Sequence, residues 1–302
     1  MAINKFMLAA LKAISYSDPG VGTDRIIDSI IHYRKYPHKM LEEQIIVDGR
    51  RVNVGIFEAK EKTCEDILVL LHGGGWTCGN IDTYSRTCTE IADFAGCTVM
   101  CVDYRLAPES PFPCALNDCY AAVKELITLF GEDKIVLIGD SAGGNLSAAV
   151  SIMANDRGEF RVSRQILIYP ATNSDYTESS PFKSVAENGK DYLLTAKKLC
   201  EYMDLYVPDK SERLSPYVAP ILCENLSNQP KTLIITAEFD PLRDEGEAYG
   251  EKLRKFGNTV SVNRMKDALH GFLSLPSRFS HVKKTYAAIC AFLRNEVIDI
   301  EK

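Results

Sequence analysis

The sequence contains no apolar run long enough to cross a membrane and no cluster of basic residues. A transmembrane helix needs about 20 consecutive apolar residues, so we do not expect a membrane-spanning protein. The formal net charge is −6 over 302 residues. Nucleic acids and anionic membrane surfaces both select for basic patches. We therefore expect neither a nucleic acid nor a membrane as a partner.

None of the ten cysteines forms the C-x-x-C spacing that zinc sites and dithiol motifs use. The first residues, MAINKFMLAALKAI, are interrupted by Lys12 and contain no clear small-residue cleavage site. They are therefore more typical of an amphipathic helix than of a secretion signal. Most cysteines lie in apolar segments, as Cys97, Cys101 and Cys290 do. This pattern predicts buried, reduced thiols in a cytoplasmic protein.

Short β-rich runs alternate with helix-like stretches along most of the chain. The strand-like runs are QIIVDG, VNVGIFEA, DILVLLHGG, CTVMCVDYR, KIVLIGDS, RQILIYP, KTLIITAEFD and NTVSVNRM. Strand–helix alternation indicates an α/β fold with a mostly parallel sheet of about eight strands and helices on both faces. The continuously apolar segments ILVLL, IVLI and LIIT are typical of strands buried on both faces.

Two segments break this alternation. Residues 1–45 have helical patterning without a strand, and residues 173–219 are rich in Tyr, Ser and Pro with helical patches. We interpret both as parts of a helical cap, or lid, over one edge of a core formed by residues 46–172 and 220–302. The last strand-like run, NTVSVNRM, is expected near the sheet edge. It is a candidate for pairing with a second copy in a homodimer.

The stretch IVLIGDSAGGNLSAAV ends a buried strand at Ser141 and continues as a helix. GDSAG fits G-x-S-x-G, the nucleophile elbow, in which a sharp strand-to-helix turn exposes the serine oxygen. A Cβ atom at Gly139 or Gly143 would collide with the neighbouring strand or helix. The alternative is a tight turn with an incidental serine, because the five-residue pattern alone also arises by chance. Its position at the carboxyl end of a strand favours Ser141 as a nucleophile.

A serine hydroxyl needs a base near neutral pH, and the chain has only five histidines. His32 and His38 lie in the strandless N-terminal segment, and His281 begins the last helix. His72 opens the stretch HGGGW, where we expect it to shape a loop. His270 follows a late strand, from which it can reach the elbow, and is the predicted base.

The base needs an acid that holds its tautomer. Asp240 ends the strand KTLIITAEFD, with Glu238, Asp244 and Glu245 nearby. Asp244 and Glu245 suit the start of the following helix, whose N-terminus attracts acidic residues. Asp240 is therefore the predicted acid. The order Ser, Asp, His on alternating strands and helices matches the α/β-hydrolase arrangement.

The glycine run in LVLLHGGGW follows a buried strand and leaves backbone amides accessible. Gly73, Gly74 and Gly75, together with Ala142 after the nucleophile, are candidates for an oxyanion hole. Glycine-rich loops also bind phosphates. This loop has neither G-K-[ST] nor G-x-G-x-x-G and lacks neighbouring basic residues, so the phosphate interpretation is less favoured.

With these residues assembled, the chain resembles the hormone-sensitive-lipase family of α/β-hydrolases, in its bacterial esterase and arylacetamide deacetylase branch. The shared motifs are HGGGW, DYRLAPE, GDSAGG, DPLRDEG and HGF, in the family's order over roughly residues 68–275. The resemblance implies an α/β-hydrolase fold with a helical cap, a nucleophile–acid–base set and an oxyanion hole. Their residues would be Ser141, Asp240 and His270, and the amides of Gly74, Gly75 and Ala142, with Gly73 in the same loop. Neither a metal nor a cofactor is implied. Arg105 and Glu109 are expected to form an ion pair, and Asp140 and Arg243 to brace the elbow and the acid loop.

The predicted activity is that of a serine carboxylesterase acting on small acetyl to butyryl esters. Four aromatic residues are candidates for the substrate pocket or, equally, for the core of the cap: Trp76, Phe182, Tyr192 and Tyr202. Two alternatives stay open: a deacetylase of acetylated sugars or small amides, and a non-catalytic relative that binds a small ligand. Plant hormone receptors of this fold replace the catalytic histidine, whereas here Ser141 and His270 are both present. No residue is evident for binding a peptide terminus, which disfavours a peptidase.

Overall fold

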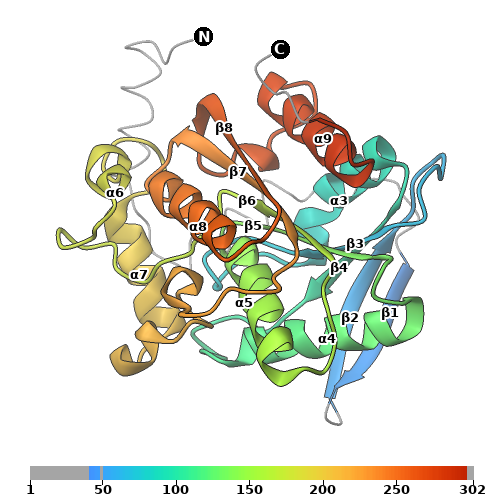
Figure 1. Ribbon diagram of the computed structural model, residues 1–302, viewed down its shortest axis with the longest axis horizontal. Helices are drawn as coiled ribbons and strands as arrows, with labels where there is room; N and C mark the ends of the chain where they lie inside the picture. Colours follow the sequence, from blue (N-terminus) through green and yellow to red (C-terminus); the bar gives the residue numbers. More distant parts are fainter. Residues whose placement is uncertain (1–40, 48–49, 298–302) are drawn as a thin grey trace.

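The computed structural model describes residues 41–47 and 50–297, which are built around one eight-stranded sheet (Figure 1). The strand order is β1-β2-β4-β3-β5-β6-β7-β8. β2 pairs antiparallel with β1 and β4, and all other neighbours are parallel, as predicted. The strands are β1 Leu41–Val47, β2 Arg50–Phe57, β3 Ile67–Leu71, β4 Thr98–Asp103, β5 Ile135–Asp140, β6 Arg164–Ile168, β7 Lys231–Phe239 and β8 Val260–Leu269.

Helices cover both faces of this sheet. On one face lie α4, α5 and α8, and on the other lie α3 and α9. The helices are α3 Ile81–Ala95, α4 Cys114–Phe130, α5 Ala142–Arg157, α6 Lys183–Asn188, α7 Ala196–Tyr206, α8 Arg243–Lys255 and α9 Ser280–Leu293. Three short 3-10 helices are η1 Lys210–Leu214, η2 Pro220–Leu222 and η3 Phe272–Ser274.

The continuously apolar strands reflect this double coverage. Successive residues of β3 alternate between the two cores: Val69 and Leu71 belong to the cluster with α4 and α5, whereas Leu68 and Leu70 pack with α3 and α9. Because helices cover both faces of the sheet, the side chains on both sides of β3 are buried among apolar residues. The sheet is therefore a rigid base for the loops at its carboxyl edge.

The N-terminal boundary differs from the prediction. β1 begins at Leu41, so residues 41–45 belong to the sheet and not to a strandless cap segment. The reason is pairing, because Leu41 lies opposite Ile56 and β2 supports the strand along its whole length. The other residues assigned to the N-terminal part of the cap, 1–40, lie outside the described residues.

The segment 173–219 contains α6, α7 and η1, in agreement with its predicted helical patches. Figure 1 shows α6 and α7 together at one side of the molecule, next to α8. β8 is an edge strand and extends to Leu269, beyond the predicted run NTVSVNRM. Its pairing with a second copy stays a prediction.

All ten cysteines are free thiols, and six of them are buried. Cys97 and Cys101 are buried, as predicted, whereas Cys290 is only partly buried. Among residues 41–47 and 50–297, no helix combines the length and apolar character that a membrane span requires.

Candidate active site

Ser141 lies at the turn between β5 and α5. Its backbone angles, φ 54° and ψ −119°, are ones that residues other than glycine rarely adopt. Glycine is required on both sides of it. A Cβ atom on Gly139 would lie 2.2 Å from the carbonyl oxygen of Gly143, and one on Gly143 would lie 1.8 Å from that of Leu71. The turn can therefore press the start of α5 against β3 and β5 only because both positions lack side chains. This close packing places Ser141 at the sheet's carboxyl edge, where it lines a cavity.

The structure brings the three predicted catalytic side chains together. His270 Nε2 lies 2.9 Å from Ser141 Oγ, and His270 Nδ1 lies 2.7 Å from Asp240 Oδ2. Asp240 is fully buried, and its Oδ1 accepts the amide of Leu242 at 2.9 Å. β8 ends at Leu269, so His270 is directly attached to the sheet. The imidazole is thus held between a hydroxyl and an immobile carboxylate.

The glycine loop after β3 contributes two residues, Gly74 and Gly75, to the same site. Gly74 and Gly75 have positive φ angles, 118° and 59°, which glycine adopts without strain. Within the described residues, the amides of Gly74, Gly75 and Ala142 donate to no acceptor. All three residues line one cavity with Ser141 and His270. The cavity is therefore bordered by three residues whose backbone N–H groups have no acceptor within the described part of the chain.

Gly73 differs from its two neighbours. Its amide lies 3.0 Å from Asp140 Oδ1 and 2.9 Å from the Tyr84 hydroxyl, so it is not available to a substrate oxygen. The inclusion of Gly73 among the accessible donors was wrong, because Asp140 ends β5, the strand next to β3, and its side chain reaches the loop. Burial raises the pKa of Asp140, although its bond from Tyr84 opposes that shift. Asp140 thus braces the glycine loop beside the elbow, as expected.

His72 shapes the same loop and takes no part in the triad. It is fully buried, its Nδ1 lies 2.9 Å from the carbonyl oxygen of Gly73, and its ring stacks on Tyr104 at 4.1 Å. A Cβ on Gly79 would lie 2.4 Å from His72 Nδ1. The ring therefore fills the space beneath the loop, as the sequence indicated.

A cavity of about 190 Å³ adjoins Ser141 and His270. Trp76 and Tyr202, two of the four predicted pocket aromatics, line it together with Leu194 and Leu199 from the segment 173–219.

Phe182 and Tyr192 do not line this cavity, contrary to prediction. Phe182 precedes α6 and packs against the core, and Tyr192 stacks on Phe239 at 5.1 Å. Both side chains help to attach the cap segment to the core.

Comparison with known proteins decides the family. A family model described as alpha/beta hydrolase fold matches residues 68–274. An arylesterase of Saccharolobus solfataricus is 34% identical over 77% of this chain and 76% of its own length. The solved structure of a hyperthermophilic esterase from the archaeon Pyrobaculum calidifontis superimposes with a TM-score of 0.87, at 32% identity, over 99% of this chain and 100% of that one. The chain belongs to the hormone-sensitive-lipase family of α/β-hydrolases.

This α/β-hydrolase is also similar to a protein that is named for binding. The gibberellin receptor GID1A of Arabidopsis thaliana is 31% identical over 76% of this chain and 69% of the receptor. Family membership alone therefore does not separate catalysis from ligand binding. The contact between Ser141 and His270 bears on that choice.

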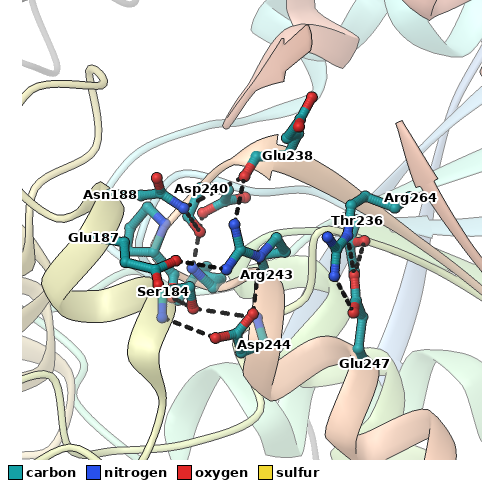
Figure 2. A network of polar contacts seen from close by, with 12 residues as sticks. Ser184, Glu187, Asn188, Thr236, Glu238, Asp240, Arg243, Asp244, Glu247 and Arg264 are labelled. Atoms are coloured by element: carbon teal, nitrogen blue, oxygen red, sulfur yellow. Dashed lines mark hydrogen bonds and ion pairs between the residues drawn. The ribbon is translucent and has the colours of Figure 1, made fainter. Parts of the chain in front are cut away.

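The hydrolase attaches its cap segment to the acid loop through α6 (Figure 2). Asn188 Nδ2 donates to the carbonyl oxygen of Asp240 at 3.2 Å. Arg243 donates to the carbonyl oxygen of Glu238 at 3.1 Å and pairs with Glu187 on α6 at 2.9 Å. As expected, Arg243 braces the loop that carries the acid, and it does so by joining that loop to the cap.

The DYRLAPE motif contributes a different ion pair from the one expected. Arg105 contacts Asp118 on α4 through two bonds of 2.9 Å, whereas Glu109 was predicted as its partner. The Asp118 side chain is 2% exposed, so α4 presents a buried carboxylate to this loop. A bidentate pair of this kind fixes the loop's orientation.

Asn145 joins both ends of the segment 173–219 to the nucleophile helix, a role that the motif analysis missed. Its Nδ2 donates at 2.8 Å to the carbonyl oxygens of Ala171 and Val218. The residue is fully buried in α5, whose other buried residues are mostly small or apolar. The signal that could have revealed it is a lone amide side chain directly after GDSAGG.

Glu245 was expected only as an acidic residue at the start of a helix, and it does lie in the first turn of α8. It is also fully buried, and its Oε1 accepts the amides of Thr172 at 2.7 Å and Asn173 at 3.1 Å. Burial raises the pKa of Glu245 to about 8, against the effect of these bonds. Below that pH the Glu245 carboxyl group is therefore neutral, and in this form it holds the start of the segment 173–219.

This pKa predicts a pH-dependent stability difference for Glu245→Gln. Between the ordinary pKa of 4.5 and about 8, the unfolded chain loses a proton that the folded chain keeps, so the stability contribution of Glu245 falls as pH rises. Glutamine stays neutral and keeps an acceptor for both amides. We expect the variant to match the parent near pH 5 and to exceed it near pH 8, with a gap growing by on the order of 1 kcal/mol per pH unit. Thermal unfolding at several pH values measures this gap, and a gap independent of pH would contradict a titrating Glu245.

Proposed function

We propose that this carboxylic ester hydrolase is a serine esterase in which Ser141 is the nucleophile, His270 the general base and Asp240 the orienting acid. His270 Nε2 accepts the hydroxyl proton as Ser141 Oγ bonds to the ester carbonyl carbon. The carbonyl electron pair moves to its oxygen. When the intermediate collapses, the carbon–oxygen bond to the alcohol breaks and His270 donates the proton to the departing alkoxide.

Water completes the cycle on the acyl-enzyme. His270 removes a proton from the water as its oxygen attacks the acyl carbon, and returns a proton to Ser141 Oγ as the carboxylic acid leaves. In both halves the negative oxygen would accept bonds from the amides of Gly74, Gly75 and Ala142. One such donor is typically worth about 10²–10³ in kcat.

One observation carries this proposal: the continuous contact from Ser141 Oγ through both imidazole nitrogens to Asp240, at 2.9 and 2.7 Å. A protein that only binds ligands has no need of a base within hydrogen-bond distance of a serine that lines its cavity. The buried acid supports the same conclusion, because Asp240 is fully buried and orients the imidazole. Catalysis thus explains the arrangement better than receptor-like binding does.

The small cavity supports short acyl groups as substrates. Its volume of about 190 Å³ lies below the roughly 300–1,000 Å³ of typical ligand pockets. Trp76 and Tyr202 occupy space that a long chain would need. Acetyl to butyryl esters of small alcohols therefore fit best. Acetylated sugars and small amides are the alternative substrates, since their acyl group is equally small.

A substrate panel tests this assignment. We expect kcat/KM to be highest for the p-nitrophenyl acetate, propionate and butyrate esters and to fall at least about tenfold by the octanoate, because each buried methylene without space loses its favourable contribution. Acetylated sugars and p-nitroacetanilide in the same panel distinguish the deacetylase alternative. A preference for either of them over the simple esters would overturn the ester assignment.

A fluorophosphonate probe separates the enzyme from a receptor. The probe should react with one equivalent of protein, and peptide mass spectrometry should locate the adduct on Ser141. Protein that binds a small ester without turnover and resists the probe would establish the non-catalytic alternative.

A further inference from the structure

Helix α7 of the cap segment lies directly on the glycine loop. Tyr206 stacks on Trp76 with ring centroids 4.5 Å apart and an interplanar angle of 3°. One turn earlier, a Cβ atom on Gly75 would lie 2.6 Å, 2.7 Å and 2.9 Å from three ring atoms of Tyr202. The ring of Tyr202 therefore lies against the backbone of Gly75. Two consecutive loop residues are thus covered by two aromatic residues of one helix, four positions apart.

Gly75 has few other restraints. The carbonyl oxygen of Gly74 accepts the amides of Thr77 and Cys78, and that of Trp76 accepts the amide of Ala107. Among residues 41–47 and 50–297, Gly75 itself forms no hydrogen bond. Its φ of 59° lies in the left-handed region, where glycine moves freely. Packing by Tyr202 is what limits its movement on the cap side.

The cap that carries Tyr202 is itself firmly attached. Asn145 holds both ends of the segment 173–219, and the polar contacts in Figure 2 join α6 to the acid loop. On α7, Leu199 and Tyr202 face the cavity, and Met203 and Tyr206 are buried. The helix therefore provides a fixed surface and not merely a cover.

We propose that Tyr202 is a positioning residue for the oxyanion hole, holding the Gly75 amide at the orientation that the negative oxygen needs. The inference rests on the proposed function, since it assigns Gly75 a catalytic amide. It makes the cap part of the chemistry: displacement of α7 loosens the donor while leaving Ser141, His270 and Asp240 in contact. An aromatic ring suits this role because a flat apolar face packs on a glycine without competing for its N–H.

Three possible roles of Tyr202 predict different kinetics. A positioning residue lowers kcat by a similar factor for every acyl length, because the oxyanion forms in each reaction. A residue that is only a cavity wall changes KM and the chain-length profile. A residue that is only structural lowers the melting temperature without a selective loss of kcat.

The first experiment measures kcat, KM and melting temperature for Tyr202→Ala and Tyr202→Phe on p-nitrophenyl acetate, propionate and butyrate. We expect Tyr202→Ala to lower kcat about 10- to 100-fold on all three esters. This decrease does not exceed the one expected when an oxyanion-hole donor is removed completely, because the Gly75 amide is misplaced and not lost. Tyr202→Phe keeps the ring and should restore most of kcat. Tyr217→Ala is the matched control, because Tyr217 lies in the same segment, bonds to Asp156 and does not line the cavity. Fluorophosphonate titration counts competent Ser141 in each sample.

The second experiment uses the steric conflict at Gly75. Gly75→Ala should lower kcat about 100-fold or more, because its Cβ meets the Tyr202 ring and because alanine is strained at a φ of 59°. Adding Tyr202→Ala to Gly75→Ala should then raise kcat, although Tyr202→Ala alone lowers it. If Tyr202→Ala does not fold, Tyr202→Leu takes its place with the same expectations, because it keeps apolar bulk and lacks the flat ring.

The outcomes are distinct. Parent enzyme that neither hydrolyses esters nor reacts with the probe refutes the proposed function. If the parent enzyme is active and Tyr202→Ala changes only KM or the chain-length profile, the positioning role is refuted and the proposed function is not. Additive losses in the Gly75→Ala, Tyr202→Ala double variant refute it as well.

Discussion

Ser141→Ala is expected to lower kcat for p-nitrophenyl acetate by about 10⁶, to the residual rate that binding and the oxyanion hole sustain. The substitution removes the oxygen that lies 2.9 Å from His270 Nε2. Without it no acyl-enzyme forms at this position. The loss is measured from initial rates at saturating substrate. The variant must be purified free of host esterases, because a trace of another esterase would hide a decrease of this size.

The fold should survive this change, since the Ser141 backbone carries the structural contacts. Its amide donates to the carbonyl oxygen of Ile168 at 2.9 Å, and alanine retains that bond. We expect melting temperatures within a few degrees of each other. Ser147→Ala is a matched control on the same helix: Ser147 Oγ donates to the carbonyl oxygen of Gly143 and lies outside the cavity. Hydrolysis retained by Ser141→Ala, or lost equally by Ser147→Ala, would contradict the role of Ser141.

Asp240→Asn is expected to lower kcat by about 10⁴ while the three side chains stay in place. Asp240 Oδ1 accepts the Leu242 amide at 2.9 Å, so the asparagine oxygen must face Leu242 to keep that bond. Its NH₂ group then faces His270 Nδ1, which must become an acceptor. The proton moves to Nε2, the nitrogen beside Ser141 Oγ, and the imidazole no longer accepts the serine proton.

A comparison of kcat for Asp240→Asn and Asp244→Asn tests whether the histidine tautomer is the cause of the loss. Asp244 is a nearby carboxylate in the first turn of α8 and pairs with Arg243 at 2.8 Å. We expect Asp244→Asn to stay within about tenfold of the parent, because it touches neither His270 nor the cavity. Equal losses in the two variants would show that the loop's charge matters and the tautomer does not. NMR detection of the imidazole proton on Nε2 in Asp240→Asn would support the mechanism directly.

Much of the site was predictable because its chemistry requires rare residues at strand ends. Five histidines left one well-placed base, and the glycines around Ser141 follow from contacts of 1.8–2.2 Å that no side chain allows. The buried strands were predictable for a similar reason: two covered faces demand apolar residues at every position. Local sequence therefore contains both the elbow and the sheet that supports it.

Other predictions failed where the outcome depended on distant packing. Arg105 pairs with Asp118, thirteen positions away, and not with nearby Glu109, because α4 folds back against the loop. Gly73 loses its free amide to Asp140, 67 positions away, through the pairing of β3 with β5. Neither contact has a local pattern, so spacing alone favoured the nearer partner or the free donor.

The sequence by itself was enough to select Ser141, Asp240 and His270 as the candidate reactive groups of this α/β-hydrolase, since each lies at or shortly after the end of a strand-like run. Only the tertiary structure decided which aromatic residues of the cap reach the site: Tyr202 faces the cavity and Gly75, whereas Tyr192 stacks on Phe239. Periodicity shows that a short helix has an apolar face, but the angle at which that helix meets the core depends on contacts with residues far along the chain. The shape of the substrate cavity is therefore a property of the packed molecule.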